Sequence, residues 1–401
     1  MPQRPHVTVA GHVCLDIIPA LEGWTGGLAE RLRPGTLSEI GPAVLSTGGA
    51  VSNTGLALHR LGVPTQLMGK IGADLFGDAL LHIFCGIDPA LTEGMLTDAA
   101  APTSYTVVLS PPGVDRLFLH CAGANDTLSA ADIRYDRLAG TRIFHFGYPP
   151  ILRRFYVDGG SELATVLQQA HAQGVATSLD MAMPDPNAPS GRADWRAILR
   201  DALPHADLFL PSLDELRFML RHTVGLPQGA AAAEDGGHTL LAEVSAVSEE
   251  LLGLGAAVVG LKLGDRGFYV RTTPDADRLA ALRRAAGADL ADWTGRELLT
   301  PCFRVQVAGT TGCGDCTVAG FLAGLLQGLS LEETLTAAVA VGACSAERPD
   351  ATSGVRPWPA VLERIRAGWA KHPLPELSGG WRANAVKMLA CGPHDREGRS
   401  Y

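Results

Sequence analysis

The chain has 401 residues, 46% of them hydrophobic, which is enough for a large core. Its formal net charge is −9 and no block of Lys and Arg occurs, which argues against nucleic acid or an anionic membrane surface as a partner. No run of 18 apolar residues is present, the first residues lack the apolar core of a signal peptide, and eight cysteines are scattered along the chain. These features predict a protein of the reducing cytoplasm.

Apolar, β-rich segments alternate with helical segments along most of the chain. Strands are expected at 7–18, 65–71, 142–146, 175–180, 206–211, 256–263 and 267–270. Helices are expected at 53–61, 77–84, 160–172, 214–220, 244–253, 317–326 and 331–346. Such alternation favours right-handed βαβ units, so the sequence predicts an α/β fold with a doubly wound, mostly parallel sheet between two layers of helices.

Two segments interrupt this rhythm and are expected to form exposed strands, at about 35–46 and 103–120. In the second, two β-rich runs flank Pro111-Pro112-Gly113, which is a hairpin turn signal. Strands that leave a doubly wound sheet can form a lid, and a lid over a site would exclude water. Open edges of such strands would be buried if two subunits paired them, so a homodimer through the lid is expected.

The later part of the chain carries three further expectations. Residues 225–239 are rich in Ala and Gly and predict a surface loop, and 274–298 predict a helical insertion. From about residue 371 the chain becomes polar and rich in Pro and Gly. We therefore expect one domain over 1–370 and a peripheral extension over 371–401.

A loop of small residues near the C-terminus ends in one carboxylate, Asp315, and a predicted helix follows it. Small side chains let backbone N–H groups approach an oxyanion, and the helix N-terminus adds partial positive charge. Asp315 could accept a proton from an alcohol, so the loop combines the anion cradle and the base that phosphoryl transfer to a hydroxyl needs. A glycine-rich turn before a helix can also be plain architecture, and the loop alone leaves both interpretations open. Cys313 and Cys316 match C-x-x-C, but neither a thioredoxin-like position nor a second pair supports a redox or zinc role.

A second group of polar and small residues lies in the first fifth of the chain. Gly48 and Gly49 precede a predicted helix that contains Asn53, whose amide offers a donor and an acceptor to vicinal hydroxyls. Asp16 lies near the end of the first predicted strand, at the sheet edge where α/β proteins bind ligands. Asn53 as a helix cap and Asp16 as a turn former are the structural alternatives. The stretch from Gly62 to Lys70 is not a phosphate-binding P-loop, because its spacing differs and Ser or Thr is missing.

These two stretches together resemble the signatures of the PfkB (ribokinase-like) carbohydrate kinase family. The glycine pair, Asn53 and the run through Gly69, Gly72, Asp74 and Gly77 are similar to its first signature, and 310–315 to its second. The resemblance extends over about 7–354, and the segment at 103–120 followed by Gly123-Ala124-Asn125 is similar to the family's β lid. It implies an ATP-dependent kinase with a ribokinase-like fold that acts on a sugar or nucleoside.

The resemblance also assigns roles to individual positions. Asp315 would be the general base, and the anion hole would consist of Gly312, Cys313 and Gly314. The acceptor would be held by Asp16, Gly48, Gly49, Asn53 and, as an alternative to a turn-capping role, Asp180. The nucleotide would be bound near Lys262, Gly264, Gly267, Thr310 and Thr311. Glu215 would organise Mg²⁺ through water, its structural alternative being a solvated acidic residue in a first helical turn.

Three positions depart from the family pattern. Gly309 replaces the Asp that commonly helps to bind an activating monovalent cation, so potassium activation is not expected. Ser212 replaces the Asn of the family's N-x-x-E element, which weakens the magnesium assignment to Glu215. Asp180 lies where many members have Asn.

The sequence thus predicts in-line transfer of the γ-phosphate of ATP to a hydroxymethyl group of a sugar of the ribose, fructose or sugar-acid class. Two alternatives remain open. A nucleoside kinase of the same family would use aromatic residues such as Tyr105 and Phe118 to stack on a base. A non-catalytic regulator would bind a sugar or nucleoside without turnover. A dinucleotide-dependent enzyme is disfavoured because no G-x-G-x-x-G follows the first strand.

Overall fold

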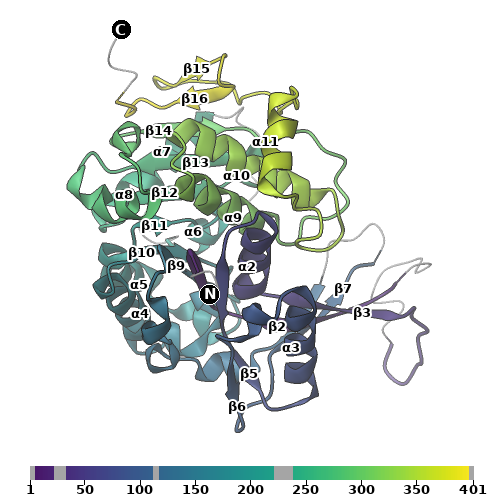
Figure 1. Cartoon of the computed structure of the whole chain (residues 1–401). Coiled ribbons are helices and arrows are strands. Elements are labelled where there is room, and N and C mark those ends of the chain that lie inside the picture. The colour runs from purple at the N-terminus through teal and green to yellow at the C-terminus, as the bar shows by residue number, and fades with distance from the viewer. Residues whose placement is uncertain (1–4, 22–32, 112–116, 221–237, 397–401) are drawn as a thin grey trace.

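A ten-stranded sheet forms the centre of the computed structural model, which describes residues 5–21, 33–111, 117–220 and 238–396 (Figure 1). Its strand order is β15-β16-β14-β13-β12-β11-β10-β9-β1-β4. The pairings from β4 to β12 are parallel, and those from β12 to β15 are antiparallel. The strands are β1 (Val7–Gly11), β4 (Thr65–Met68), β9 (Ile143–Gly147), β10 (Ala176–Asp180), β11 (Leu208–Phe209), β12 (Val258–Lys262), β13 (Phe268–Thr272), β14 (Glu297–Thr300), β15 (Arg382–Asn384) and β16 (Leu389–Cys391). This confirms the predicted α/β class with a mostly parallel sheet.

Helices cover both faces of this sheet, because its strands carry apolar side chains on both sides. On one face lie α2 (Ala50–Arg60), α3 (Leu75–Ile87), α8 (Ala280–Ala286), α9 (Cys313–Leu326), α10 (Leu331–Ala346) and α11 (Trp358–Arg366). On the other lie α4 (Ser161–Ala172), α5 (Trp195–Ala202), α6 (Leu213–Met219) and α7 (His238–Gly253). Within β12, Val258 belongs to the first apolar core and Val259 to the second, as a strand with alternating directions requires. In the part of the chain that the structure describes, no helix is long and apolar enough to cross a membrane.

The predicted first strand at 7–18 is in fact two strands in two different sheets. β1 ends at Gly11, and β2 (Cys14–Pro19) pairs with β3 (Ala43–Gly48) and β7 (Tyr105–Leu109). A side chain at Gly11 would overlap the carbonyl oxygen of Gly147, so the chain passes β9 very closely and then turns away. Asn125 holds the bend: its amide nitrogen donates to the Val13 carbonyl (2.8 Å).

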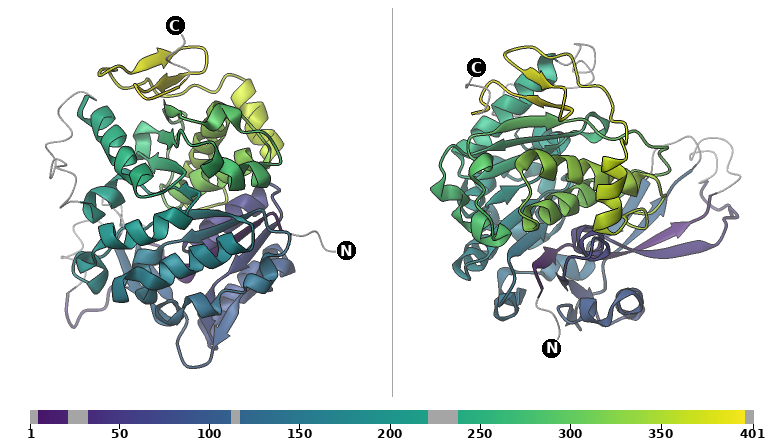
Figure 2. Two further views of the ribbon diagram at one scale, coloured as in Figure 1. Left: turned by 90° about the vertical axis from the view of Figure 1, so that its left-hand side faces the viewer. Right: turned by 45° about the horizontal axis from the view of Figure 1, so that its top comes forward.

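The lid is a four-stranded sheet of order β3-β2-β7-β8, where β8 is Leu117–Cys121 (Figure 2). The predicted hairpin is confirmed by the antiparallel pairing of β7 and β8, while most of its turn lies outside the described residues. The other predicted lid strand is shorter than expected, since β3 begins only at Ala43. The loop predicted at 225–239 also falls largely outside the described residues, and α7 begins at His238.

The residues between Gly69 and Gly77 have structural roles. A third, two-stranded sheet joins β5 (Lys70–Gly72) to β6 (Leu96–Asp98), so the strand predicted at 65–71 is interrupted at Gly69. Asp74 caps α3 by accepting from the Gly77 backbone N–H (2.9 Å), and it also accepts from the backbone and hydroxyl of Thr103 (2.7 Å each). This cluster ties the start of α3 to the segment that enters β7.

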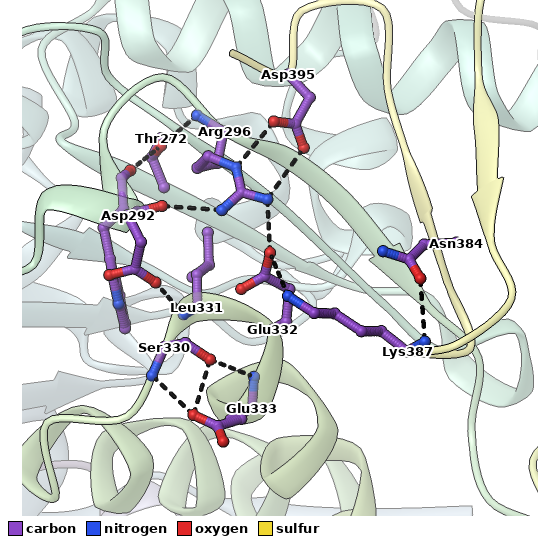
Figure 3. Close-up of polar contacts among 11 residues, drawn as sticks. Thr272, Asp292, Arg296, Ser330, Leu331, Glu332, Glu333, Asn384, Lys387 and Asp395 are labelled. Atoms are coloured by element: carbon purple, nitrogen blue, oxygen red, sulfur yellow. Dashed lines mark hydrogen bonds and ion pairs between the residues drawn. The ribbon is translucent and has the colours of Figure 1, made fainter. Parts of the chain in front are cut away.

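The expected helical insertion at 274–298 contains one short helix, α8, and ends in β14 at the sheet. The region from 371 onwards lies at that edge of the molecule, where β15 and β16 continue the main sheet beyond β14. Figure 3 shows its anchor: Arg296, itself buried, donates to Asp395 (2.8 Å) and to Glu332 of α10 (2.7 Å). Asp395 is fully buried, so this extension is fixed by a buried ionic network; a domain boundary at 370 stays a prediction.

Candidate active site

The predicted site residues gather where the parallel strands end. β1, β9, β10 and β12 finish at the same edge of the sheet with Gly11, Gly147, Asp180 and Lys262, and β11 lies between β10 and β12. This edge is where open α/β sheets bind ligands. Figure 1 shows α9 close to the ends of these strands. The packing of α9 against α2 brings residues more than 250 positions apart in the sequence into contact.

Asp315 lies in the first turn of α9 and is 3% exposed. Gly312 precedes the helix with a left-handed φ of 71°, which suits glycine and directs the following N–H groups to the same side as Asp315. The Asn53 amide donates to Oδ2 of Asp315 (3.0 Å) and the Thr54 hydroxyl to Oδ1 (3.4 Å). Burial raises the pKa of Asp315 above its ordinary value, although Lys262 and these donors oppose the rise. The carboxylate is therefore a better proton acceptor than one in water.

A third donor to this carboxylate was missed by sequence reasoning. The Tyr148 hydroxyl lies 2.8 Å from both carboxylate oxygens of Asp315. Tyr148 has a left-handed backbone, φ 68° and ψ 42°, and Pro149 follows it. A bulky residue there costs about 1–2 kcal/mol, and a following proline also disfavours helical ψ values. The rest of the fold maintains this strained conformation, which places the phenol on Asp315.

The glycine pair makes room for two side chains. A Cβ at Gly48 would overlap the carboxylate of Asp16, and one at Gly49 would overlap the ring and backbone of His12. Gly49 also has φ 86°, which disfavours any other residue. The predicted acceptor residues Gly48, Gly49 and Asp16 therefore form one compact unit with His12.

His12 is buried and Asp16 is half-buried. Burial raises the pKa of Asp16 to about 6, against hydrogen bonds from Cys14 and Thr106 that lower it. Burial and then the nearby His120 lower the pKa of His12 well below its ordinary value, so the ring is neutral. Neither ring nitrogen of His12 has a partner, and the Asn53 amide oxygen has none either. Buried polar atoms normally have hydrogen-bond partners, so these three atoms are places where a polyhydroxyl ligand can form its hydrogen bonds.

Lys262 and Asp180 form a buried ion pair. The Lys262 ammonium lies 2.6 and 2.8 Å from the two Asp180 oxygens, and Oδ1 also accepts from the Met181 N–H (2.8 Å). Burial opposes the charge of Lys262, but Asp180, Glu215 and Asp315 together raise the pKa of Lys262. Both oxygens of Asp180 are thus engaged by protein groups, which fits a structural role; its contact with an acceptor stays a prediction.

A cavity of about 450 Å³ is lined in part by Asp315, and none of its lining residues belongs to α2. Its lining includes the predicted phosphate- and nucleotide-side residues Lys262, Gly264, Gly267, Thr310, Gly312, Cys313 and Gly314. Thr311, which was also predicted, is not part of this lining. Apolar side chains, among them Phe303, Val305 and Val339, line another part of the wall. The cavity therefore combines a polar end at Asp315 with an apolar region suited to a heterocyclic base.

Glu215 and Gly309 bear on the expected metal sites. Glu215 lines the cavity, and its Oε2 accepts from the Ser212 N–H (2.7 Å) as part of a capping box. Glu215 is a carboxylate in the cavity lining as well as a cap, so the residue fits both the capping and the metal interpretation. A Cβ at Gly309 would lie 2.9 Å from backbone atoms of Arg348 and Pro349. The carboxylate that commonly helps to bind a monovalent cation is absent, and the space for it is restricted.

Solved structures of low sequence identity share this fold over nearly the whole chain. A ribokinase of Arabidopsis thaliana complexed with ribose and ATP matches with a TM-score of 0.66 and 19% identity, covering 91% of this chain and 99% of that one. A fructokinase with bound ATP from Xylella fastidiosa matches with a TM-score of 0.65 and 21% identity, covering 90% and 98%. These similarities confirm the predicted ribokinase-like architecture.

The sequence comparisons then define the family. A model of the pfkB family carbohydrate kinases matches residues 4–358, so the chain belongs to the PfkB family and is a carbohydrate kinase. Fructokinase-1 of Oryza sativa subsp. japonica is 25% identical over 354 residues, which cover 85% of this chain and 91% of that relative. An uncharacterized sugar kinase of Archaeoglobus fulgidus is 24% identical over 282 residues, covering 69% and 89%.

Proposed function

We propose that the protein transfers the γ-phosphate of ATP to a hydroxymethyl group of a sugar, with Asp315 as the general base. One observation carries the proposal: Asp315 lines the cavity next to the glycine loop and also accepts a hydrogen bond from Asn53 of α2. It therefore lies between a place for a nucleotide and a place for an acceptor. The named fructokinase and ribokinase relatives and the ATP in two of the similar structures support ATP and a sugar as substrates.

The nucleotide would lie in the 450 Å³ cavity. Its base would contact the apolar wall, and its phosphates would lie along Gly264, Gly267 and Thr310 toward the start of α9. The N–H groups of Gly312, Cys313 and Gly314 and the partial positive charge of the helix end would stabilise the transferred phosphoryl group. Lys262 contributes a positive charge beside Gly314. Mg²⁺, held by the phosphates and through water by Glu215, would neutralise charge that develops between the β and γ phosphates.

The acceptor would occupy the opposite side of Asp315. Asp16 offers a carboxylate, Asn53 an unpartnered amide oxygen and His12 two unpartnered ring nitrogens, all suited to sugar hydroxyls. Asp180 would act there mainly by holding Lys262 in place. The lid strands would cover the acceptor and exclude water.

In the reaction, the acceptor oxygen attacks the γ phosphorus in line with the bond to the ADP oxygen, which breaks as the new P–O bond forms. The hydroxyl has too high a pKa to ionise beforehand, so its proton passes to Asp315 as the bond forms. The raised pKa of Asp315 favours this late transfer.

The alternatives have weaker support. A nucleoside acceptor would need Tyr105 and Phe118 to stack on its base. The Tyr105 ring packs edge-on against Phe76 (5.3 Å between ring centres), and Phe118 is 58% exposed on the lid. A non-catalytic regulator would not need the complete glycine loop with a buried base beside it. Neither alternative is favoured by a specific observation.

A coupled assay for ADP tests the proposal, with ribose, fructose, ketodeoxy sugar acids and nucleosides as acceptors. We expect at least one sugar to be phosphorylated by the native chain, and Asp315→Asn, measured in parallel, to lose that activity. Turnover of nucleosides alone would favour the alternative kinase. Binding of a sugar without any product would favour the regulator.

We also propose that the chain forms a homodimer through its lid. The edge strands β3 and β8 carry exposed apolar side chains: Val44, Leu45, Leu117, Phe118 and Leu119. Pairing two lids would bury this surface and the open strand edges. Light scattering should give twice the mass of the chain, and Phe118→Glu should give the single mass; a native monomer at assay concentration would contradict the proposal. No disulfide joins the eight cysteines, all of which lie in the described part of the chain, and this supports the proposed cytoplasmic location.

A further inference from the structure

Four polar contacts surround the carboxylate of Asp315, which is the number an ionised carboxylate accepts. Asn53 donates to Oδ2 and Thr54 to Oδ1, and the Tyr148 hydroxyl lies 2.8 Å from each oxygen. An acceptor hydroxyl that gives its proton to Asp315 needs one of these positions. Asn53 and Thr54 are buried in α2, whereas Tyr148 is only half-buried, so Tyr148 is the donor that an entering hydroxyl can reach and replace.

We propose that the Tyr148 hydroxyl occupies the position of the acceptor hydroxyl on Asp315 until a sugar binds, and thereby keeps water away from the base. The inference rests on the proposed function of Asp315. Tyr148 is a positioning residue in this account: it covers the base in the free enzyme, and the entering hydroxyl replaces it.

The environment of Tyr148 keeps its hydroxyl protonated and directed at Asp315. Burial and then the charge of Asp315 raise the pKa of Tyr148 well above its ordinary value, so the phenol is always a donor. The backbone N–H of Tyr148 donates to the Asp180 carbonyl (3.2 Å), which fixes the left-handed turn. Tyr148 lies one residue beyond the end of β9 and is only half-buried.

The groups that face this pair come from several elements. Lys262 of β12, Asp180 of β10 and Glu215 of α6 contribute charges, and the neutral His12 follows β1. The His12 ring centre lies 6.2 Å from that of Tyr148 and 5.2 Å from that of His120 on the lid. An acceptor that contacts the unpartnered nitrogens of His12 would therefore lie next to Tyr148 and could displace its hydroxyl.

The side reaction that this arrangement would suppress is the hydrolysis of ATP. A water on Asp315 would attack the γ phosphorus, the bond to the ADP oxygen would break, and the water proton would pass to Asp315, giving ADP and phosphate. While the Tyr148 hydroxyl contacts both carboxylate oxygens, a water cannot take this position on the base. Covering the base therefore suppresses ATP consumption while no sugar is present.

Tyr148→Phe tests the inference, with Tyr156→Phe as the matched control because Tyr156 packs against Trp195, away from Asp315. In the absence of sugar we expect ATP hydrolysis by Tyr148→Phe to rise about fivefold, which corresponds to one ordinary hydrogen bond. The control variant should hydrolyse ATP at the native rate. The double variant Tyr148→Phe/Asp315→Asn should lose the increase, because the exposed base is gone.

A pH profile gives a readout that a merely structural role would not change. Asp315 loses a donor in Tyr148→Phe, so the acid limb of kcat/KM for the sugar should move up by about one pH unit. If Tyr148→Phe proves unstable, Tyr148→Asn lacks the phenol and tolerates a left-handed backbone, and it should behave alike.

Two outcomes would overturn the inference. One is a folded, active Tyr148→Phe with native hydrolysis and a native pH profile. The other is a loss of sugar phosphorylation of more than about a hundredfold without extra hydrolysis, which would assign Tyr148 a direct part in transfer. The proposed function itself fails separately, if the native chain phosphorylates no sugar or if Asp315→Asn retains the activity.

Discussion

Asp16→Asn should make the free protein more stable and a poorer enzyme. Burial raises the pKa of Asp16 from 3.8 to about 6, and a shift of this size corresponds to about 3 kcal/mol. The folded state therefore holds the proton more tightly than the unfolded state. Stability is retained below pH 4, is lost as pH rises from about 4 to 6, and stays lower above pH 6. Asparagine carries no charge and avoids this loss.

The magnitude follows from the length of the chain. With an unfolding entropy of about 2.1 cal/mol/K per residue, 401 residues give about 0.8 kcal/mol per kelvin. Asp16→Asn should thus raise Tm by about 3–4 °C at pH 8 and by nearly nothing at pH 4. Differential scanning calorimetry across this range, without substrates, measures both values.

The same substitution should weaken sugar binding, since a hydrogen bond to a charged group contributes about 10- to 150-fold in affinity. We expect KM for the sugar to rise by this factor at pH 8, with KM for ATP unchanged. In the native enzyme, KM for the sugar should rise as pH falls through about 6. An equal Tm difference at pH 4 and pH 8, or a lower Tm of the variant at pH 8, would refute the reasoning.

Three further predictions follow from single sites. Gly48→Ala would place a methyl group on the Asp16 carboxylate, so KM for the sugar should rise at least about tenfold while KM for ATP stays unaltered. Steady-state kinetics measures both KM values, and an equal rise in the two would contradict this prediction. Asp395→Ala would leave the buried Arg296 with one partner fewer, which should cost about 3 kcal/mol and about 4 °C in Tm, and an unchanged Tm would count against the buried network. Because Gly309 supplies no carboxylate, activity in KCl and in NaCl at equal ionic strength should agree within about twofold, and a tenfold preference for K⁺ would disprove that prediction.

Much of the site was predictable because its residues act through local chain geometry. In a glycine loop that leads into a helix, the free N–H groups and a carboxylate of the first turn lie on the same side of the helix end. Gly312 and Asp315 have this arrangement. Asn53 was predicted beside the acceptor, and it contacts Asp315 directly across 262 positions of sequence. The alternation of strands and helices likewise predicted the sheet and its two helical layers.

The other site residues could not be predicted, because their roles depend on where their side chains point in the fold, and neighbouring residues in the sequence do not determine that. Tyr148 carries no motif of its own, and only its left-handed backbone directs the phenol to Asp315. His12 lies in the first apolar run of the sequence, and only the fold shows that it fills the space beside Gly49. The tail beyond residue 371 was predicted to be peripheral because it is polar and rich in Pro and Gly. Only the partner Arg296 explains why the charge of Asp395 is buried.

The central claim is that Asp315 is the base for phosphoryl transfer, and one measurement tests it most directly. The rate of sugar phosphorylation by Asp315→Asn should be compared with that of the native chain at saturating ATP and sugar, with the ATP dissociation constant measured by calorimetry. We predict that kcat falls by about 10²- to 10⁴-fold while ATP affinity changes less than about threefold. A variant that keeps near-native kcat would contradict the account.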